Sequence, residues 1–544
     1  MVSLDSKREW YRYHALFAQA LCNRLGRIHA DLVPILHYRA SLWYAEHNQM
    51  TQAILHALYA QEWQWAADLI EQAHLPLLLL TWGGKERELF RLREWLERLP
   101  AEVMYARPQL YLACAQILWQ VAPPSLLQHW LDTAEATLIT SLTTQMHENG
   151  SSTILTSPTR QEQENLLGGV IAWRAFLLSF DQDAEVVFPL CQRALTLLSA
   201  ENSVGRRHVA WAQHMAYYTS SANDAMATLQ GALQTSLLVQ AAGVTADAIN
   251  HLATITLIML GIGQLHETQR YIEQARLLAT QPGGMVLPEV GWSLISQVEI
   301  LREWNELDAA LSLAEEAISL CKKTESIVSL MYVLYAYAVL VRVYLSRRDY
   351  DAACFALEEF EQIGMGMNQH VSLLIRSLFT TIDQIRLWLA CGELDRATRW
   401  AEALDVRERH SNPLVCEREE VACVRVLLAK QQPNPALERL EPVLRRATTG
   451  QRWGHVIEMR LLQALAYRMS QQETQALDAL SEALRLAEPE GYLRSFVDEG
   501  ASMAALLSLL REQQRKAGPT PYLDTLLAAF QEPSKAQKRP QKRR

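Results

Sequence analysis

Six polar and aromatic residues recur at matching positions in the middle of the chain, and their side chains suit ligand binding. Three charged residues each lie eleven residues before a recurring alanine: Glu299, Arg342 and Arg386. Two aromatic residues stand seven residues earlier in the same units, and an asparagine holds that position one unit before: Trp292, Tyr335 and Asn250. Guanidinium groups and aromatic faces together suit an anionic or hydroxyl-rich ligand.

Arg342 interrupts an otherwise apolar run, Leu330–Val341. An unpaired charge in an apolar environment is strongly unfavourable. Arg342 is therefore expected either to face a groove or to pair with a neighbour such as Glu299. A ladder of ion pairs that stiffens the protein is the alternative interpretation of the same residues.

A repeat of helix pairs is predicted to position these residues. A residue that starts a helix is followed by a small residue three positions later and by a second one ten positions later, as in Leu307, Ala310 and Ala317. The pattern recurs every 38 to 44 residues, with clear copies that start at positions 265, 307, 350, 394 and 473 and weaker copies at 184, 222 and 434. Small residues at these offsets let neighbouring helices approach closely. We therefore predict an all-α fold in which tetratricopeptide-like helix pairs stack into a superhelix.

The helix upstream of each start carries the six candidate residues. In tetratricopeptide-like superhelices this first helix lines the concave side, so the candidates are predicted to form a groove there. The N-terminal third is less regular, although Met50 and Trp63 begin two short segments with the same offsets. Residues 140–165 are rich in Ser, Thr, Gln and Asn, which predicts a flexible loop.

The composition is typical of a folded protein of the cytoplasm. Of the 544 residues, 49% are hydrophobic and 20% are charged, and the formal net charge is −9. The eight cysteines form no C-x-x-C pair, which indicates a reducing compartment and no disulfide or zinc framework. The longest apolar stretch is too short to span a bilayer, and the first residues lack the apolar core of a signal peptide. We therefore expect no membrane association.

No catalytic or cofactor-binding motif stands out. The stretch Gly83-Gly84-Lys85 lacks the first glycine and the Ser/Thr of a phosphate loop, which predicts a turn between helices. Neither H-E-x-x-H nor G-x-S-x-G is present. Ser319 and Lys322 match a bare S-x-x-K, but the companion motifs of that chemistry are missing. We expect a protein without catalytic residues, cofactor or metal site.

Several stretches carry a family likeness, and they extend over about residues 8 to 531. They are WYRYHALF (10–17), HYRASLWY (37–44), AILHA (53–57), WQWAADLI (63–70), LREWLERLP (92–100), RPQL (107–110), EGYLR (490–494), FVDEG (496–500) and YLDTLLAAF (522–530). Together they resemble the helical repeat region of MalT-like regulators, the large ATP-binding members of the LuxR family. The first stretch resembles the last helix of the winged-helix module that precedes this region.

The resemblance implies an inducer-sensing role. In the family a nucleotide-binding module precedes the helical region and a helix-turn-helix DNA reader follows it, and neither is recognised in this sequence. We therefore expect no ATP hydrolysis and no specific DNA binding by this chain alone. The last twelve residues carry six basic side chains and no acid, so any affinity for DNA should be weak and salt-dependent.

The expected organisation has six parts. They are a winged-helix remnant (1–30), N-terminal helical repeats (31–139), a flexible loop (140–165), the superhelix (166–488), C-terminal closing helices (489–531) and a basic disordered tail (532–544). The expected partner is a small-molecule inducer or a protein in the concave groove, and self-association is a further partner class. The alternative function is a stand-alone tetratricopeptide-like scaffold that binds a peptide or protein.

The substitutions Ala310→Leu and Ala353→Leu should each lower the free energy of unfolding by about 1–3 kcal/mol, because added bulk where helices touch forces them apart. Urea unfolding of each variant measures the change. Unchanged midpoints for both would mean that the repeat register is wrong.

Overall fold

The computed structural model describes residues 2–3, 11–12, 15–81, 93–105, 107–119, 122–147, 159–180, 184–220, 223–241, 245–323, 327–365, 376–406, 412–514 and 521–531. Every described element is a helix except β1 (Val2–Ser3) and β2 (Tyr11–Arg12), which pair antiparallel. The all-α prediction is therefore confirmed. The chain divides into two compact units, residues 1–170 and 171–544.

The first unit stacks consecutive helices against one another. Its helices are α1 (Ala15–Ile28), α2 (Leu32–Glu46), α3 (Met50–Ala60), α4 (Trp63–Thr81), α6 (Ala101–Tyr105), α7 (Pro108–Leu118), α8 (Pro124–His147) and the first part of α9 (Arg160–Leu178). The predicted starts at Met50 and Trp63 are the first residues of α3 and α4. Three residues on, Ala53 and Ala66 are fully buried, so the small side chains lie where helices touch.

The beginning of the chain differs from the expectation. The resemblance predicted a helix over Trp10–Phe17, whereas Tyr11–Arg12 is a strand and α1 begins at Ala15. Tyrosine favours the extended backbone, which accounts for a short strand at this position.

The loop predicted over 140–165 is shorter than expected at both ends. Helix α8 continues to His147, and α9 begins at Arg160. The hydroxyl of Thr140 donates to the carbonyl of Ala136 at 2.8 Å, which lets a polar residue remain inside the helix. Residues 148–158 in the middle of the loop, the turn predicted at Gly83 and the basic tail lie outside the described residues.

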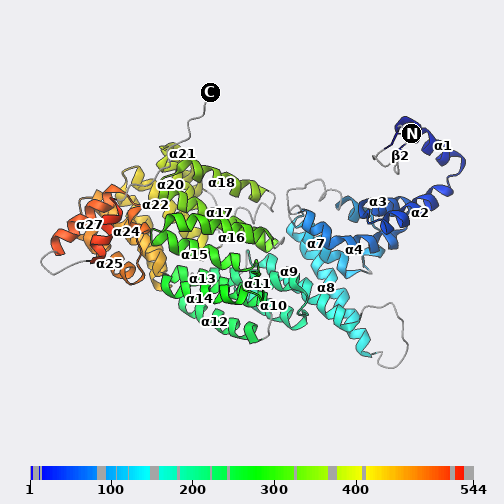
Figure 1. Cartoon of the computed structure of the whole chain (residues 1–544), viewed down its shortest axis with the longest axis horizontal. Helices are drawn as coiled ribbons and strands as arrows, with labels where there is room; N and C mark the ends of the chain where they lie inside the picture. The colour runs from blue at the N-terminus through cyan, green and yellow to red at the C-terminus, as the bar shows by residue number, and fades with distance from the viewer. Residues whose placement is uncertain are drawn as a thin grey trace. The chain divides into compact units, whose positions relative to one another are not determined.

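The second unit consists of helix pairs followed by a closing segment (Figure 1). We call the first helix of each pair an inner helix. The inner helices are α11 (Ser203–Ser220), α13 (Thr245–Ile262), α15 (Val290–Glu303), α17 (Ile327–Arg347), α20 (Thr381–Ala390), α22 (Pro413–Ala429) and α24 (Trp453–Met469). Its second helices are α10 (Ala184–Leu197), α12 (Ala225–Ala241), α14 (Leu265–Ala279), α16 (Leu307–Lys323), α18 (Tyr350–Met365), α21 (Leu394–Val406), α23 (Pro433–Thr449) and α25 (Glu473–Ala487). The closing elements are η1 (Glu488–Glu490), α26 (Arg494–Val497), α27 (Ala501–Gln514) and α28 (Pro521–Ala529).

Six of the eight predicted starts are the first residues of second helices: 184, 265, 307, 350, 394 and 473. The other two starts are wrong by a few residues. Helix α12 begins at Ala225, and α23 begins at Pro433 instead of 434. Proline suits the first turn of a helix because its missing N–H has no partner there.

A left-handed residue separates the two helices of most pairs. It lies two positions before the second helix, at Gly263, Asn305, Arg348, Gly392, Gln431 and Gln471. After Gly392, the amide of Glu393 bonds the carbonyl of Trp388 at 2.8 Å, which closes the end of the first helix. Glycine and asparagine adopt this conformation readily, whereas arginine and glutamine do so at some conformational cost. Because glycine, asparagine, arginine and glutamine all occur at this position, the geometry of the helix pair requires the turn, and no single residue type does.

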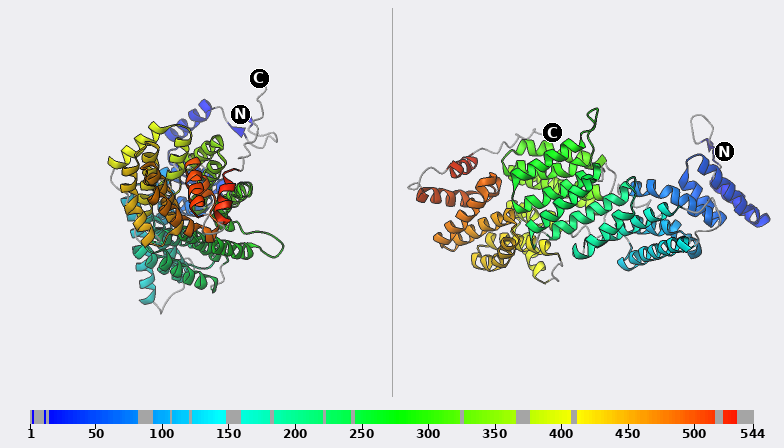
Figure 2. Two further views of the ribbon diagram at one scale, coloured as in Figure 1. Left: turned by 90° about the vertical axis from the view of Figure 1, so that its left-hand side faces the viewer. Right: turned by 90° about the horizontal axis from the view of Figure 1, so that it is seen from below.

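The superhelix closes on itself. Helix α13 packs against α24, where a Cβ on Gly263 would lie 2.8 Å from the nitrogen of Gly454. Nearby, the amide of Ala225 donates to the carbonyl of Gly450 at 3.0 Å. The end-on view in Figure 2 (left) shows the red C-terminal helices between orange and green helices, and Figure 1 shows that α25 and α27 lie at one end of the stack. The inner face of the superhelix is consequently an interior and not an open groove.

Two inner helices are long and apolar enough to cross a membrane by composition alone, Thr245–Ile262 and Leu330–Arg347. In each, 78% of the apolar window is buried inside the protein. Burial on all sides by neighbouring helices accounts for their composition.

The substitution Gly454→Ala should lower the free energy of unfolding by about 1–3 kcal/mol, because the added methyl group forces α13 and α24 apart. Its Cβ would lie 2.7 Å from the carbonyl oxygen of Leu260, a backbone atom. Gly261→Ala is the matched control, since a Cβ there meets nothing within 4 Å. Urea unfolding compares the two, and equal midpoints would contradict closure through this contact.

Candidate functional site

A cavity inside the superhelix brings together four of the six candidate residues: Glu299, Tyr335, Arg342 and Arg386. Its volume is about 170 Å³. Its wall is formed by residues of the inner helices α11, α13, α15, α17, α20, α22 and α24, and by the segment that follows α25. Residues far apart in the sequence therefore meet because the inner helices surround one space.

Helical spacing brings charged side chains to the inner face of each helix. On α15, Glu299, Arg302 and Glu303 are three and four residues apart. On α20, Asp383 and Arg386 are three residues apart. Residues at these spacings lie on one face of a helix. All five line the cavity, so its wall is densely charged.

Arg342 lies between two carboxylates. Its Nε donates to Oδ2 of Asp383 at 2.9 Å, and its Nη1 donates to Glu299. Burial alone would lower the pKa of Arg342, but the charges of Asp383 and Glu299 raise it well above the usual value. The predicted pairing of Arg342 with Glu299 is confirmed, and the guanidinium group is held fixed at the cavity wall.

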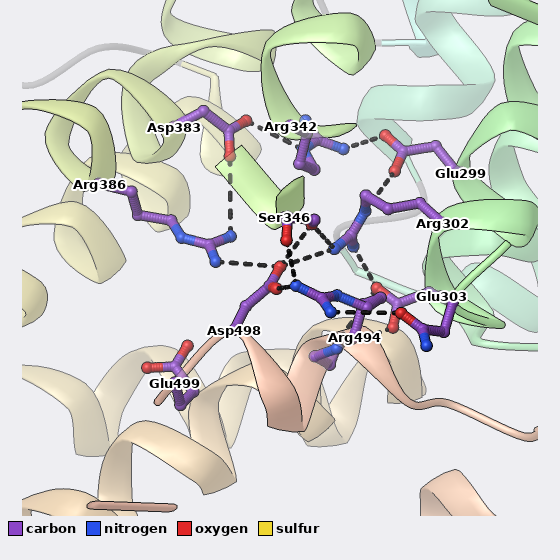
Figure 3. A network of polar contacts seen from close by, with 12 residues as sticks. Glu299, Arg302, Glu303, Arg342, Ser346, Asp383, Arg386, Arg494, Asp498 and Glu499 are labelled. Carbon is purple, nitrogen blue, oxygen red and sulfur yellow. Dashed lines mark hydrogen bonds and ion pairs between the residues drawn. The ribbon is translucent and has the colours of Figure 1, made fainter. Parts of the chain in front are cut away.

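Asp498 joins three arginines, two of which, Arg302 and Arg386, line the cavity (Figure 3). Its carboxylate lies 3.2 Å from Nη1 of Arg302 and 3.3 Å from Nη2 of Arg386, and it also pairs with Arg494. The hydroxyl of Ser346 donates to it at 2.7 Å. Burial alone would raise the pKa of Asp498, but the charges of Arg386, Arg494 and Arg302 lower it. The carboxylate is therefore kept ionised inside the protein.

The segment that carries Asp498 also docks through its main chain. The amide of Leu493 donates to the carbonyl of Glu303 at 2.9 Å, and the amide of Ser495 donates to its carboxylate at 3.0 Å. The groove predicted from the sequence is thus partly filled by the protein's own C-terminal region, which was expected to form closing helices over 489–531.

The sequence pattern missed Arg425. Its Nη2 donates to Glu458 at 2.8 Å and to Glu499 at 2.9 Å. With α23 starting at Pro433, the buried small residue of this unit is Ala436, and Arg425 lies eleven residues before it. It holds the same repeat position as Arg342 and was overlooked because the start was placed one residue late.

One arginine of the wall makes no side-chain hydrogen bond or ion pair with the residues that the structure describes. Arg418 lies on α22, seven residues before Arg425, and lines the cavity. Within the described part of the chain, no hydrogen bond or ion pair joins its guanidinium to another residue, and its Nε is buried without a partner. An occupant of the cavity would therefore find a free donor at this position.

Asn250 and Trp292 lie in the core and not in the cavity wall. Each is 2% exposed. Trp292 stacks on Tyr332 with ring centroids 4.0 Å apart, and Tyr332 meets the edge of Trp211 from α11. Closure of the superhelix brings α11 onto α17, so positions that would face an open groove become buried.

Aromatic rings complete the cavity wall. The rings of Tyr335 and Phe379 have centroids 4.6 Å apart, and Tyr218 of α11 stacks against Phe379. Burial raises the pKa of Tyr335, so its hydroxyl stays protonated and can donate a hydrogen bond. The wall offers ring faces as well as charges.

The described residues contain no group of three His, Cys, Asp or Glu side chains placed to hold a metal ion. Burial raises the pKa of Cys114 and of Cys191 to about 12, so both thiols stay protonated and are poor nucleophiles. Ser319 and Lys322 are exposed on α16, away from the cavity wall. What the cavity supplies is charge, hydrogen bonds and ring faces.

A second buried ion pair joins the ends of α22 and α24. Nη2 of Arg452 donates to Glu417 at 2.6 Å, and Nδ1 of His455 lies 2.8 Å from the same carboxylate. The Glu417 side chain is 3% exposed. Burial alone would raise the pKa of Glu417, but hydrogen bonds and charges from His455 and Arg452 lower it to about 2.

Glu417 should make the fold sensitive to acid. Its pKa is lowered on folding, so the stabilisation is present above about pH 4.5 and is lost as the pH falls towards 2. The shift corresponds to roughly 3 kcal/mol in the free energy of unfolding. Urea unfolding between neutral and acidic pH measures it. Glu417→Gln should lose most of this dependence, whereas the exposed control Glu512→Gln should keep it; equal curves would contradict the assignment.

Known proteins resemble this chain over most of its length. The HTH-type transcriptional regulator MalT of Klebsiella pneumoniae is 25% identical over 513 residues, which cover 93% of this chain and 52% of the relative. The regulator of the same name from Cronobacter sakazakii is 26% identical over 518 residues, with the same coverage. The chain therefore spans about half the length of the curated relatives it matches.

The family match coincides with the second unit. The model of the MalT-like TPR region matches residues 168–513, which include every inner helix, the cavity and most of the closing segment. The repeat starts, the left-handed turns and the closed stack of helix pairs agree with that assignment. This chain belongs to the family with the MalT-like TPR region.

Proposed function

We propose that the second unit is the ligand-sensing module of a MalT-like transcriptional regulator and that a small polar molecule binds in its cavity. The observation that carries this proposal is the cavity itself, whose wall comes from seven successive inner helices. An occupant there contacts most of the repeats at once. Its binding free energy would favour one arrangement of the whole stack.

The charges of the wall narrow the chemistry of the ligand. The lining arginines are Arg302, Arg342, Arg386, Arg418 and Arg425, and the lining carboxylates are Glu299, Glu303, Asp383, Glu458 and Glu499. These five positive and five negative groups balance. A compact molecule with hydroxyl groups can bridge such pairs and lie against a ring face without disturbing the balance. A small anion that takes the free guanidinium of Arg418 is the alternative ligand class.

Thermal unfolding of the whole chain tests the proposal with glucose as a hydroxyl-rich probe and inorganic phosphate as an anionic one. One of the two should raise the Tm, because a ligand of the native state stabilises it. Arg418→Gln should abolish that rise, because the probe loses the guanidinium donor at the cavity wall, and the rise is measured against the Tm of the same variant without ligand. Arg399→Gln, an exposed arginine on α21, is the matched control and should keep the rise.

Two outcomes would contradict the proposal. If neither probe changes the Tm, the cavity does not take the ligand classes that its wall suggests. If the rise persists in Arg418→Gln, the probe binds elsewhere on the protein.

The scaffold function is supported by a different observation. The interior of the superhelix already holds a peptide segment, the closing residues Leu493–Glu499, through main-chain bonds and ion pairs. A partner peptide of similar chemistry would need that space. Binding of peptides but not of small molecules would favour this second candidate.

A further inference from the structure

The segment between α25 and α27 crosses the interior of the superhelix and has a glycine in the left-handed conformation near each end. Gly491 has φ +72° and Gly500 has φ +74°. A Cβ on Gly500 would meet nothing within 4 Å, so conformation and not crowding favours glycine there. We name residues 491–500 the latch. Glycines of this kind are able to absorb large changes in φ and ψ, as hinge residues do.

Polar contacts hold the latch to the inner helices. Asp498 pairs with Arg302 and Arg386, and its side chain is 4% exposed. Glu499 accepts two hydrogen bonds from Arg425, at 2.9 and 3.2 Å. These are buried ion pairs, whose attraction is largely offset by the loss of hydration. Charges of this type fix where a segment docks while adding little net stability, so they suit a reversible contact.

The latch is tied to the last helix of the described chain. Phe496 is fully buried, and its ring meets that of Tyr522 edge to face. The hydroxyl of Tyr522 also donates to the carbonyl of Tyr492. Helix α28, which carries Tyr522, contacts only α26 and α27 among its principal neighbours. Its position therefore depends on the latch.

We propose that residues 491–500 are a hinged latch that undocks from the superhelix as a unit, loosening α28 and removing one side of the cavity wall. Three latch residues, Tyr492, Ser495 and Glu499, line the cavity. An occupant of the cavity therefore touches the latch and biases its docking; this coupling rests on the proposed function, whereas the hinge does not. The latch connects the inner helices to the C-terminal helices by a physical contact.

Hydrogen exchange on the full chain tests undocking without any ligand. The amides of Leu493 and Ser495 bond to Glu303 only in the docked state, so they report on it directly. Asp498→Asn should speed their exchange at least about ten-fold, because three arginines lose the charge that they share. Gly500→Ala should speed it about five-fold, because alanine disfavours the left-handed conformation. Amides of α28 should follow, and those inside α15 and α17 should not.

Each variant has a matched control. Asp308→Asn removes an exposed carboxylate that pairs with Arg347 on the outside of the stack. Gly283→Ala replaces another left-handed glycine, with φ +98° and nothing within 4 Å of a Cβ. Both controls should leave latch exchange unchanged. Because Gly500→Ala removes no charge, it tests whether the latch undocks even if Asp498→Asn unfolds the unit.

Two results would contradict the proposal that the latch undocks. Faster exchange throughout α15 and α17 in Gly500→Ala would mean that the segment is inseparable from the core. Latch exchange in both variants equal to that of the controls would mean that it does not undock through these contacts. Neither result depends on which ligand the cavity takes, so the proposed function is tested separately.

Discussion

Backbone contact between α13 and α24 is the constraint on which the rest of the second unit depends. Gly263 and Gly454 allow two inner helices to touch without side chains between them, and an open stack of helix pairs becomes a closed one. Closure removes water from the inner face. Most charged groups on that face therefore pair inside the protein, since unpaired burial is costly. The charged network is the consequence of this closure.

The same arginines stabilise the fold and, in the proposed function, surround the ligand. Arg342 is committed to Glu299 and Asp383, as expected of a ladder that stiffens the stack, yet it also forms cavity wall. Removing one member of such a network leaves a charge unpaired, so its loss affects folding before it affects binding. Arg418 differs because it lines the cavity and makes no hydrogen bond or ion pair with any residue that the structure describes, which makes it the better probe of binding.

A closed stack with a docked C-terminal segment suits a signalling role. The cavity wall includes residues from distant repeats and from the latch, so the proposed ligand would favour one arrangement of the whole unit. A ligand bound by one repeat alone would not affect the arrangement of the other repeats in this way. Membership of a family whose curated relatives are transcriptional regulators fits this arrangement.

The sequence by itself determined the repeat. Offsets between small residues predicted six of the second helices to the residue, because close helix packing is a local and periodic requirement. It also placed Glu299 and Arg342 at equivalent positions that prove to be neighbours. It misplaced the start of α23 by one residue, because Leu437 was taken for the residue at the third offset instead of the small Ala436, and Arg425 was lost with it.

Only the tertiary structure decided what faces the cavity. Asn250 and Trp292 share a repeat position with Tyr335, yet closure buries the first two in the core and leaves the third in the wall. Asp498 lies 156 residues after Arg342 in the chain, and no periodicity links the two. Which residues meet across a closed superhelix depends on the accumulated rotation of successive pairs, a long-range quantity that local spacing does not encode.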